Sequence, residues 1–107
     1  VVIVTLDRHL SSAVDRAAQT LRRDLPGLTL SLHAAAEWGE NPSSLADARA
    51  DIERADIVVA NMLFMDDHIQ MIAPTLRARR ETCDAMLCAM SAGEVVKLTK
   101  LGGWRMD

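Results

Sequence analysis

Four short apolar runs, each followed by a stretch with helical periodicity, constrain the fold of this chain more than any other feature. The first run is rich in β-branched residues and continuous, as expected of a strand that is covered on both faces. Strands that alternate with amphipathic helices indicate a parallel sheet with right-handed crossovers and helices on both faces. The expected strands are residues 1–6, 28–32, 56–62 and 85–89.

The first two helices have clear boundary signals. Apolar residues three and four positions apart predict a helix over residues 10–25, and Pro26 with Gly27 stops it. The second helix is expected to begin with Asn41 as its N-cap and Pro42 as its first helical residue, because these residue types are favoured at those positions.

The last two helices carry less regular signals. The third is expected from about Asp67, and Pro74 should kink or restart it because proline lacks a backbone N–H. Ser91 and Glu94 have the spacing of a capping box, in which each side chain satisfies a backbone N–H at the start of a helix. This last helix is expected to bury Val95, Leu98 and Leu101 and to end at Gly102-Gly103.

The order of these elements predicts an α/β fold class. We expect an open parallel four-stranded sheet with helices on both faces, flavodoxin- or Rossmann-like, with strand order 2-1-3-4. A length of 107 residues fits a single domain. Because the chain starts within a strand and lacks a closing signal, residues 1–107 are expected to form one α/β domain, the N-terminal fragment of a much larger subunit.

Composition excludes several classes of protein. Half of the residues are hydrophobic, which excludes a disordered chain, and only 3% are aromatic, which predicts an aliphatic core. The net charge of -3 is mild and mixed in sign, so nucleic acid is not an expected partner. No apolar run approaches the roughly 20 residues of a membrane span.

The two cysteines are expected to be free. Cys83 and Cys88 are five positions apart on an expected strand, so their side chains should point to opposite faces and cannot readily form a disulfide. Two buried thiols fit a reducing compartment.

Polar residues follow the expected strands at their carboxyl ends, where open α/β sheets bind ligands. All three histidines, His9, His33 and His68, lie at or just beyond such ends, each with a carboxylate nearby in the sequence. One interpretation is a metal or ligand site on a shared rim, because imidazole and carboxylate are common ligands. The alternative is that these are ordinary polar loop residues and that Asp66 or Asp67 caps a helix.

Other side chains near these ends also allow two interpretations. Trp38 lies in a polar loop, where an exposed tryptophan indicates contact with another domain or a ligand. The turn from Ser91 to Glu94 could hold an anion, although a capping box explains both residues without one. Met62 and Met65 flank Phe64, and the three form either an apolar wall for a flat ligand or core or interdomain packing. The candidate ligand-binding residues are therefore His33, Glu37, Trp38, His68, Ser91 and Glu94; no catalytic residue and no metal ligand is assigned.

Two segments resemble the N-terminal domain of the large, porphyrin-binding subunit of magnesium chelatase. They are residues 64–69 (FMDDHI) and residues 90–99 (MSAGEVVKLT), and residues 2–7 and 32–38 also fit. The resemblance covers nearly the whole chain and is weakest over residues 39–49. The large subunit of the related cobaltochelatase is a weaker match.

The resemblance implies a function that composition does not supply. Enzymes of that family use ATP hydrolysis to insert Mg²⁺ into protoporphyrin IX during chlorophyll and bacteriochlorophyll biosynthesis. The implied partners are the rest of the large subunit, the ATP-hydrolysing subunits and protoporphyrin IX, with Mg²⁺ as a substrate. The implied location is the bacterial cytoplasm or the plastid stroma, and the fragment alone is expected to be inactive. The alternative is a structural or docking module of a cobaltochelatase-type large subunit without direct ligand contact.

Overall fold

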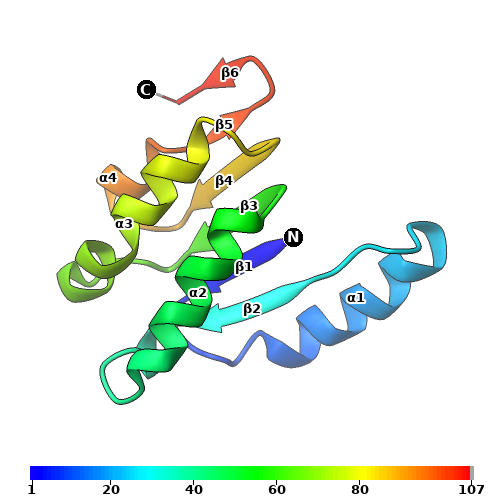
Figure 1. The fold of residues 1–107 in the computed structure, drawn as a ribbon, viewed down its shortest axis with the longest axis horizontal. Helices are drawn as coiled ribbons and strands as arrows, with labels where there is room; N and C mark the ends of the chain where they lie inside the picture. The colour runs from blue at the N-terminus through cyan, green and yellow to red at the C-terminus, as the bar shows by residue number, and fades with distance from the viewer. Residues whose placement is uncertain (107) are drawn as a thin grey trace.

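A six-stranded mixed sheet runs through the structure, a computed structural model that describes residues 1–106 (Figure 1). The strand order is β2-β1-β3-β4-β5-β6. The order 2-1-3-4 is confirmed for the parallel strands, but the expectation of a four-stranded, purely parallel sheet is wrong, because an antiparallel hairpin extends it. The parallel strands are β1 (Val2–Thr5), β2 (Ser31–Ala34), β3 (Ile57–Asn61) and β4 (Ala85–Ala89); the antiparallel ones are β5 (Lys100–Leu101) and β6 (Trp104–Arg105).

The helices lie close to their expected positions, except for the last. Asn41 is the N-cap of α2 as predicted, although its side chain makes no capping hydrogen bond. The third helix runs through Pro74 without restarting. The helices are α1 (Ser11–Asp24), the 3-10 turn η1 (Ala35–Glu37), α2 (Pro42–Arg54), α3 (Asp66–Arg80) and α4 (Gly93–Val96).

The helix expected to reach Leu101 is only a single turn, so that prediction is wrong. Beyond it the chain pairs with β4: the Cys88 N–H donates to Thr99 Oγ1 at 3.0 Å, and the Thr99 hydroxyl donates to the Cys88 carbonyl at 3.0 Å. Gly102 adopts a left-handed φ of 61° between the paired residues Leu101 and Trp104. The Gly-Gly pair therefore forms a two-residue hairpin turn rather than a helix C-cap.

The end of α3 anchors this hairpin. Arg80 is buried, and its Nε donates to the Leu98 carbonyl at 2.8 Å. Lys100 Nζ donates to the Arg80 carbonyl at 2.8 Å, and the Arg105 guanidinium pairs with Glu81 at 3.0 Å. These contacts hold β5 and β6 against the body of the domain.

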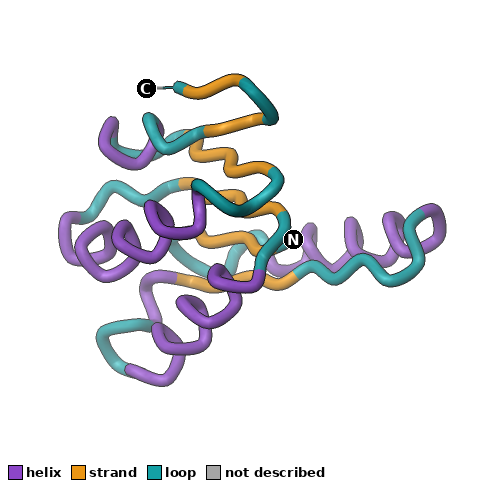
Figure 2. The backbone as a smooth tube through the Cα atoms, turned by 45° about the horizontal axis from the view of Figure 1, so that its top comes forward, coloured by secondary structure: helices purple, strands orange, loops and turns teal. Residues whose placement is uncertain are grey.

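One face of the sheet forms the core. Val4, Val58 and Met86 are fully buried, and α2 and α3 pack side by side over them (Figures 1 and 2). The core is aliphatic as expected, apart from Trp38. The helix residues that cover this face are Ala48 and Ile52 of α2, Ile69, Ile72, Ala73 and Leu76 of α3, and Val95 of α4.

The cysteines are free and buried, as predicted. Cys88 lies in β4, but Cys83 precedes that strand, so its placement on the strand was wrong.

β2 also begins later than expected, because residues 28–30 lead from a turn at Leu25 rather than pairing in the sheet. A right-handed crossover from β1 to β2 places α1 on the face opposite α2 and α3.

Candidate functional site

The four parallel strands end at one edge, which carries the candidate residues. His9 follows β1, His33 lies in β2, His68 is in the first turn of α3 after β3, and Ser91 follows β4. The prediction that these residues share one rim is confirmed. Open α/β sheets bind ligands at this edge, beside the point where the strand order reverses between β1 and β3.

Three candidate residues meet at one cavity of this edge. His33, Glu37 and Trp38 line a cavity of about 130 Å³ between the end of β2, η1 and the start of α2. Arg8, Ser44 and Asp47 supply further polar groups, so the cavity is suited to water or a small polar ligand.

Ion pairs occupy two of these side chains. The Arg8 guanidinium donates to both carboxylate oxygens of Glu37, and this hydrogen bonding holds the pKa of Glu37 below its ordinary value. His33 Nε2 lies 2.6 Å from Asp51 Oδ2. Burial raises the pKa of Asp51, but hydrogen bonds from His33, Arg54 and Ser31 outweigh it and lower that pKa overall.

The partners in these ion pairs were missed by sequence reasoning. Arg8 lies 29 positions from Glu37, and Asp51 lies 18 positions from His33. No local spacing connects either pair: Arg8 follows β1 and reaches Glu37 only when β1 pairs with β2, and Asp51 reaches His33 only when α2 packs beside β2. His33 pairs with Asp51 rather than with Glu37, the carboxylate near it in sequence.

Trp38 is buried, with only 3% of its surface exposed, so its expected exposure is wrong. Its ring meets that of His68 edge-on, with centroids 6.0 Å apart and an interplanar angle of 76°. The pair brings a fourth candidate residue next to the cavity that Trp38 lines. Sequence reasoning failed because the neighbours of Trp38 in sequence are polar, whereas its neighbours in space belong to the core cluster.

Four buried polar atoms gather at the carboxyl ends of β1 and β3 and around this ring pair. Within residues 1–106, Trp38 Nε1, His68 Nδ1, Thr5 Oγ1 and Asn61 Oδ1 have no hydrogen-bond partner. Buried polar groups in proteins are generally paired with protein or water. This edge of the sheet therefore offers donors and acceptors to a small polar molecule.

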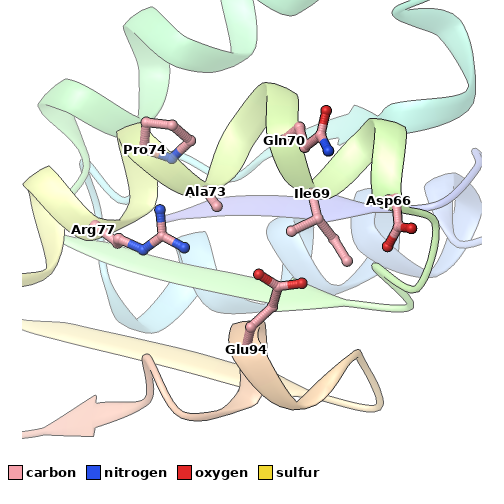
Figure 3. A pocket seen from close by; sticks show the side chains of 7 residues that line it. All are labelled: Asp66, Ile69, Gln70, Ala73, Pro74, Arg77 and Glu94. Carbon is pink, nitrogen blue, oxygen red and sulfur yellow. The ribbon is translucent and has the colours of Figure 1, made fainter.

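A second, larger groove of about 270 Å³ lies between α3 and α4 (Figure 3). The side chains of Arg77 and Glu94 extend toward each other across it, and Asp66 lies at its other end. Ile69 and Ala73 of α3 supply apolar lining. The groove combines both signs of charge with an apolar wall, and Glu94 is the one candidate residue that lines it.

The capping box predicted for Ser91 and Glu94 is wrong. The N-cap of α4 is Ala92, and no side chain caps the helix. Ser91 Oγ instead accepts the Leu63 N–H at 3.1 Å and donates to the Ala89 carbonyl at 3.0 Å. Ser91 therefore ties the ends of β3 and β4 together, and Glu94 has no capping role.

An apolar rim, formed by Phe64, Met65 and Met90, projects from the same two strand ends. All three side chains are more than half exposed. The backbone beneath them turns sharply, since Met62 and Met90 have left-handed φ values of 58° and 48°. The Met62 N–H donates to the Met90 carbonyl at 2.8 Å, which fixes the two turns side by side. Exposure of Phe64 and Met65 contradicts core packing and is compatible with both an apolar wall for a ligand and packing against another domain.

Neither a cluster of metal ligands nor a membrane-spanning helix is found in the described part of the chain. Among residues 1–106, no group of three or more His, Cys, Asp or Glu side chains is arranged to hold a metal ion. Over that range no helix has the length and apolar character needed to cross a bilayer.

The fold and its edge define a doubly wound α/β domain with polar cavities and an apolar rim at the carboxyl ends of its strands. The chain belongs to the family described as "Domain of unknown function (DUF3479)", which matches residues 1–107. It is 52% identical over all 107 residues to the magnesium-chelatase H subunit of Cereibacter sphaeroides, and covers 9% of that protein. It is 47% identical over 102 residues, 95% of the chain, to the magnesium-chelatase H subunit of Rhodobacter capsulatus, again covering 9%.

These comparisons confirm the resemblance seen in the sequence to the large subunit of magnesium chelatase. The chain spans less than a tenth of the length of the curated relatives it matches.

Proposed function

We propose that this chain is one domain of a magnesium chelatase large subunit that takes part in ATP-dependent insertion of Mg²⁺ into protoporphyrin IX for bacteriochlorophyll or chlorophyll biosynthesis. The observation that carries the proposal is 52% identity over all 107 residues to a magnesium-chelatase H subunit. In this proposal Mg²⁺ and the porphyrin are substrates, and ATP is hydrolysed by partner subunits.

The cavities are too small to enclose a porphyrin, so their sizes support a role in which the domain borders the porphyrin site without surrounding the ligand. Pockets that enclose drug-sized ligands have volumes of about 300–1,000 Å³. The cavity at the carboxyl edge and the groove between α3 and α4 measure about 130 and 270 Å³, and both are partly lined by charged side chains. The rim formed by Phe64, Met65 and Met90 is better suited to contact a flat apolar ring from one side.

The candidate residues divide into two groups under this proposal. His33 and Glu37 are held in ion pairs and position the loop that carries Trp38, which packs on His68. Glu94 faces the open groove, where a carboxylate could accept a pyrrole proton or assist the slow dehydration of Mg²⁺. We therefore assign Glu94 the more direct role, and Ser91 the role of supporting the rim.

The function is tested with the full-length subunit and its ATP-hydrolysing partners. Protoporphyrin IX is supplied with Mg²⁺ and ATP, and Mg-protoporphyrin is followed by its fluorescence. The proposal predicts product only when ATP is present. Insertion of Co²⁺, followed by loss of the porphyrin's fluorescence, with none of Mg²⁺ would favour the cobaltochelatase-type alternative. Insertion of neither metal would refute a chelatase that acts on protoporphyrin IX.

Glu94→Gln tests the role of the groove in the same assembly. Loss of the charge is expected to lower the turnover of Mg²⁺ insertion about a hundredfold or more, in the range typical of a positioned acid–base group. Glu40→Gln, in the exposed loop before α2, is the matched control and should leave turnover unchanged. Equal activity of the two variants, with equal thermal stability, would remove Glu94 from the reaction.

The docking alternative, in which the domain touches no ligand, is supported by a different feature of the structure. The sheet face opposite the core carries many exposed apolar side chains. The alternative excludes the border role, because it allows no ligand contact at the rim, whereas docking through the opposite face of the sheet would not by itself exclude that contact.

A further inference from the structure

Two rows of apolar side chains cross the sheet face that lies opposite the core. The first row consists of Leu32, Ile3, Val59 and Leu87, which are register partners across β2, β1, β3 and β4. Side chains alternate between the faces of a strand, so register partners of parallel strands lie on the same face. None of the four is fully buried, and Leu87 is 42% exposed.

The second row runs beside the first and reaches the hairpin. It consists of Ile57, Ala85, Leu101 and Trp104, which are register partners across β3, β4, β5 and β6. Ile57 and Ala85 lie two positions before Val59 and Leu87, so both rows share one face. Leu101 is 45% exposed and Trp104 is 52% exposed. We call the surface made by the two rows the open face.

The open face contrasts with the core face of the same strands. Val58 and Met86, which alternate with residues of the open face, have no exposed surface. Parallel sheets in α/β proteins are covered by helices on both faces. The open face is apolar, like a sheet face that is covered by helices, but no helix covers it in residues 1–106.

Helix α1 does not provide that cover. Of its 14 residues only Ala18 is buried, and Leu21 on its apolar stripe is exposed. The helix lies beside β2 at the edge of the sheet, away from β3 and β4 (Figure 1). A strip over β1, β3, β4 and β5 is therefore left between α1 and β6.

We propose that an amphipathic helix from another segment of the same polypeptide docks on the open face, over β1, β3, β4 and β5, between α1 and β6. The three spacings from β1 to β5 give a width of about 15 Å, which accommodates one helix of about 10 Å diameter. The helix presents an apolar stripe to the two rows and a polar face to solvent.

The length of the relatives supports an occupant from the same polypeptide. The chain covers 9% of each relative, so a parent of similar length supplies ample further chain. A segment tethered to the domain has a high effective concentration and docks without a separate binding partner. This inference rests on the proposal that the chain is one domain of a larger subunit.

Cysteine accessibility in the full-length subunit tests the inference. Leu87→Cys places a thiol in the first row, and Ala50→Cys places one on an exposed position of α2 as the matched control. The native Cys83 and Cys88 are buried. Iodoacetamide labelling is followed by mass spectrometry at each site. The thiol at position 87 is expected to react about tenfold or more slowly than that at 50, because the docked helix must open first.

Two further measurements separate docking from a folding defect and from self-association. Leu101→Cys repeats the labelling in the second row, so a folding defect of one variant does not decide the outcome. Protection should be independent of protein concentration; protection lost on dilution would assign the open face to a second copy and overturn the inference. Labelling at 87 and 101 as fast as at 50 would also overturn it.

The outcome is separable from that of the proposed function. Labelling uses no porphyrin, Mg²⁺ or ATP, so a protected thiol in a subunit without chelatase activity would support docking alone. An active subunit with freely reactive thiols at 87 and 101 would refute docking and leave the chelatase proposal standing.

Discussion

Met62 and Met90 carry backbone conformations that ordinarily belong to glycine. A left-handed conformation costs a residue with a Cβ about 1–2 kcal/mol. Both methionines sit where a strand turns into the rim, and the hydrogen bond between them couples the two turns. Strain of this kind gathers at functional sites, which agrees with a role for the rim.

The strain at Met90 predicts an inverted preference between alanine and glycine. At most positions glycine is less stable than alanine by about 0.5–1 kcal/mol. Met90→Gly should instead be about 1 kcal/mol more stable than Met90→Ala, since only glycine adopts this φ without strain. Urea unfolding of both variants measures the difference. Ala46→Gly, within α2, is the control and should show the ordinary loss of about 1 kcal/mol.

Asp51 predicts a pH-dependent contribution to stability. Its pKa in the folded state lies below the usual 3.8, so its ion pair with His33 stabilises the fold above that pH. The part of the stability advantage over Asp51→Asn that comes from this shift should shrink as the pH falls from about 5 through the lowered pKa. Unfolding by denaturant at pH 7, 4 and 3 checks this.

Asp15→Asn, on the exposed surface of α1, is the control for that series. An advantage that grows as the pH falls below about 5 would contradict the assigned direction of the Asp51 shift.

For individual residues, the sequence predicted the edge of the sheet on which the histidines lie, but it did not predict which side chains they contact. Strand ends are local signals, and they located His33, His68 and Ser91. Burial of Trp38 and the pairing of Asp51 with His33 depend on long-range packing, which no local pattern encodes.

Among the elements, the four parallel strands were predictable and the hairpin was not. β4 matches its expected bounds, because a short apolar run between polar segments is a strong strand signal. Residues 95–101 were misread because apolar residues three apart fit a helix, while the hydroxyl of Thr99 fixes the chain to β4. The Gly102-Gly103 pair was the available signal for a hairpin turn.

Substitution of Thr99 measures how much its two hydrogen bonds to Cys88 stabilise the fold. Thr99→Val keeps the shape but leaves the Cys88 N–H without its acceptor in a buried site. The variant should lose about 1–3 kcal/mol of unfolding free energy. Thr99→Ser retains the hydroxyl and should lose less. Thermal or urea unfolding ranks the two, and a valine variant as stable as the serine variant would show that the hydrogen bonds contribute little.

At the scale of the whole molecule, the two faces of the sheet differ in a way that the sequence did not predict. The strands β1, β3 and β4 read as continuous apolar runs, which indicates cover on both sides, whereas β2 shows only a weak alternation. The helices supply full cover on one side only, because α1 lies at the edge beside β2. The apolar pattern of the strands thus predicted that both faces of the sheet are covered, but not which segment covers each face.

Labelling of the two buried cysteines by iodoacetamide is expected to report global unfolding of the domain. Burial raises the pKa of Cys88 to about 11, so at pH 8 its thiolate fraction is on the order of a hundredfold below that of a free thiol. Both thiols should resist iodoacetamide in the folded domain and react together once denaturant unfolds it. Mass spectrometry follows the reaction. Rapid labelling of Cys88 without denaturant would show that β4 opens locally.

The two tryptophans give the domain separate optical reporters. Trp38 is enclosed in the core beside the imidazole of His68, whereas Trp104 is half exposed on the last strand. An enclosed indole emits at shorter wavelength than one in contact with water, so the fluorescence of the domain should contain two resolvable bands. A helix arriving on the open face would shift the Trp104 band to the blue and leave the Trp38 band in place.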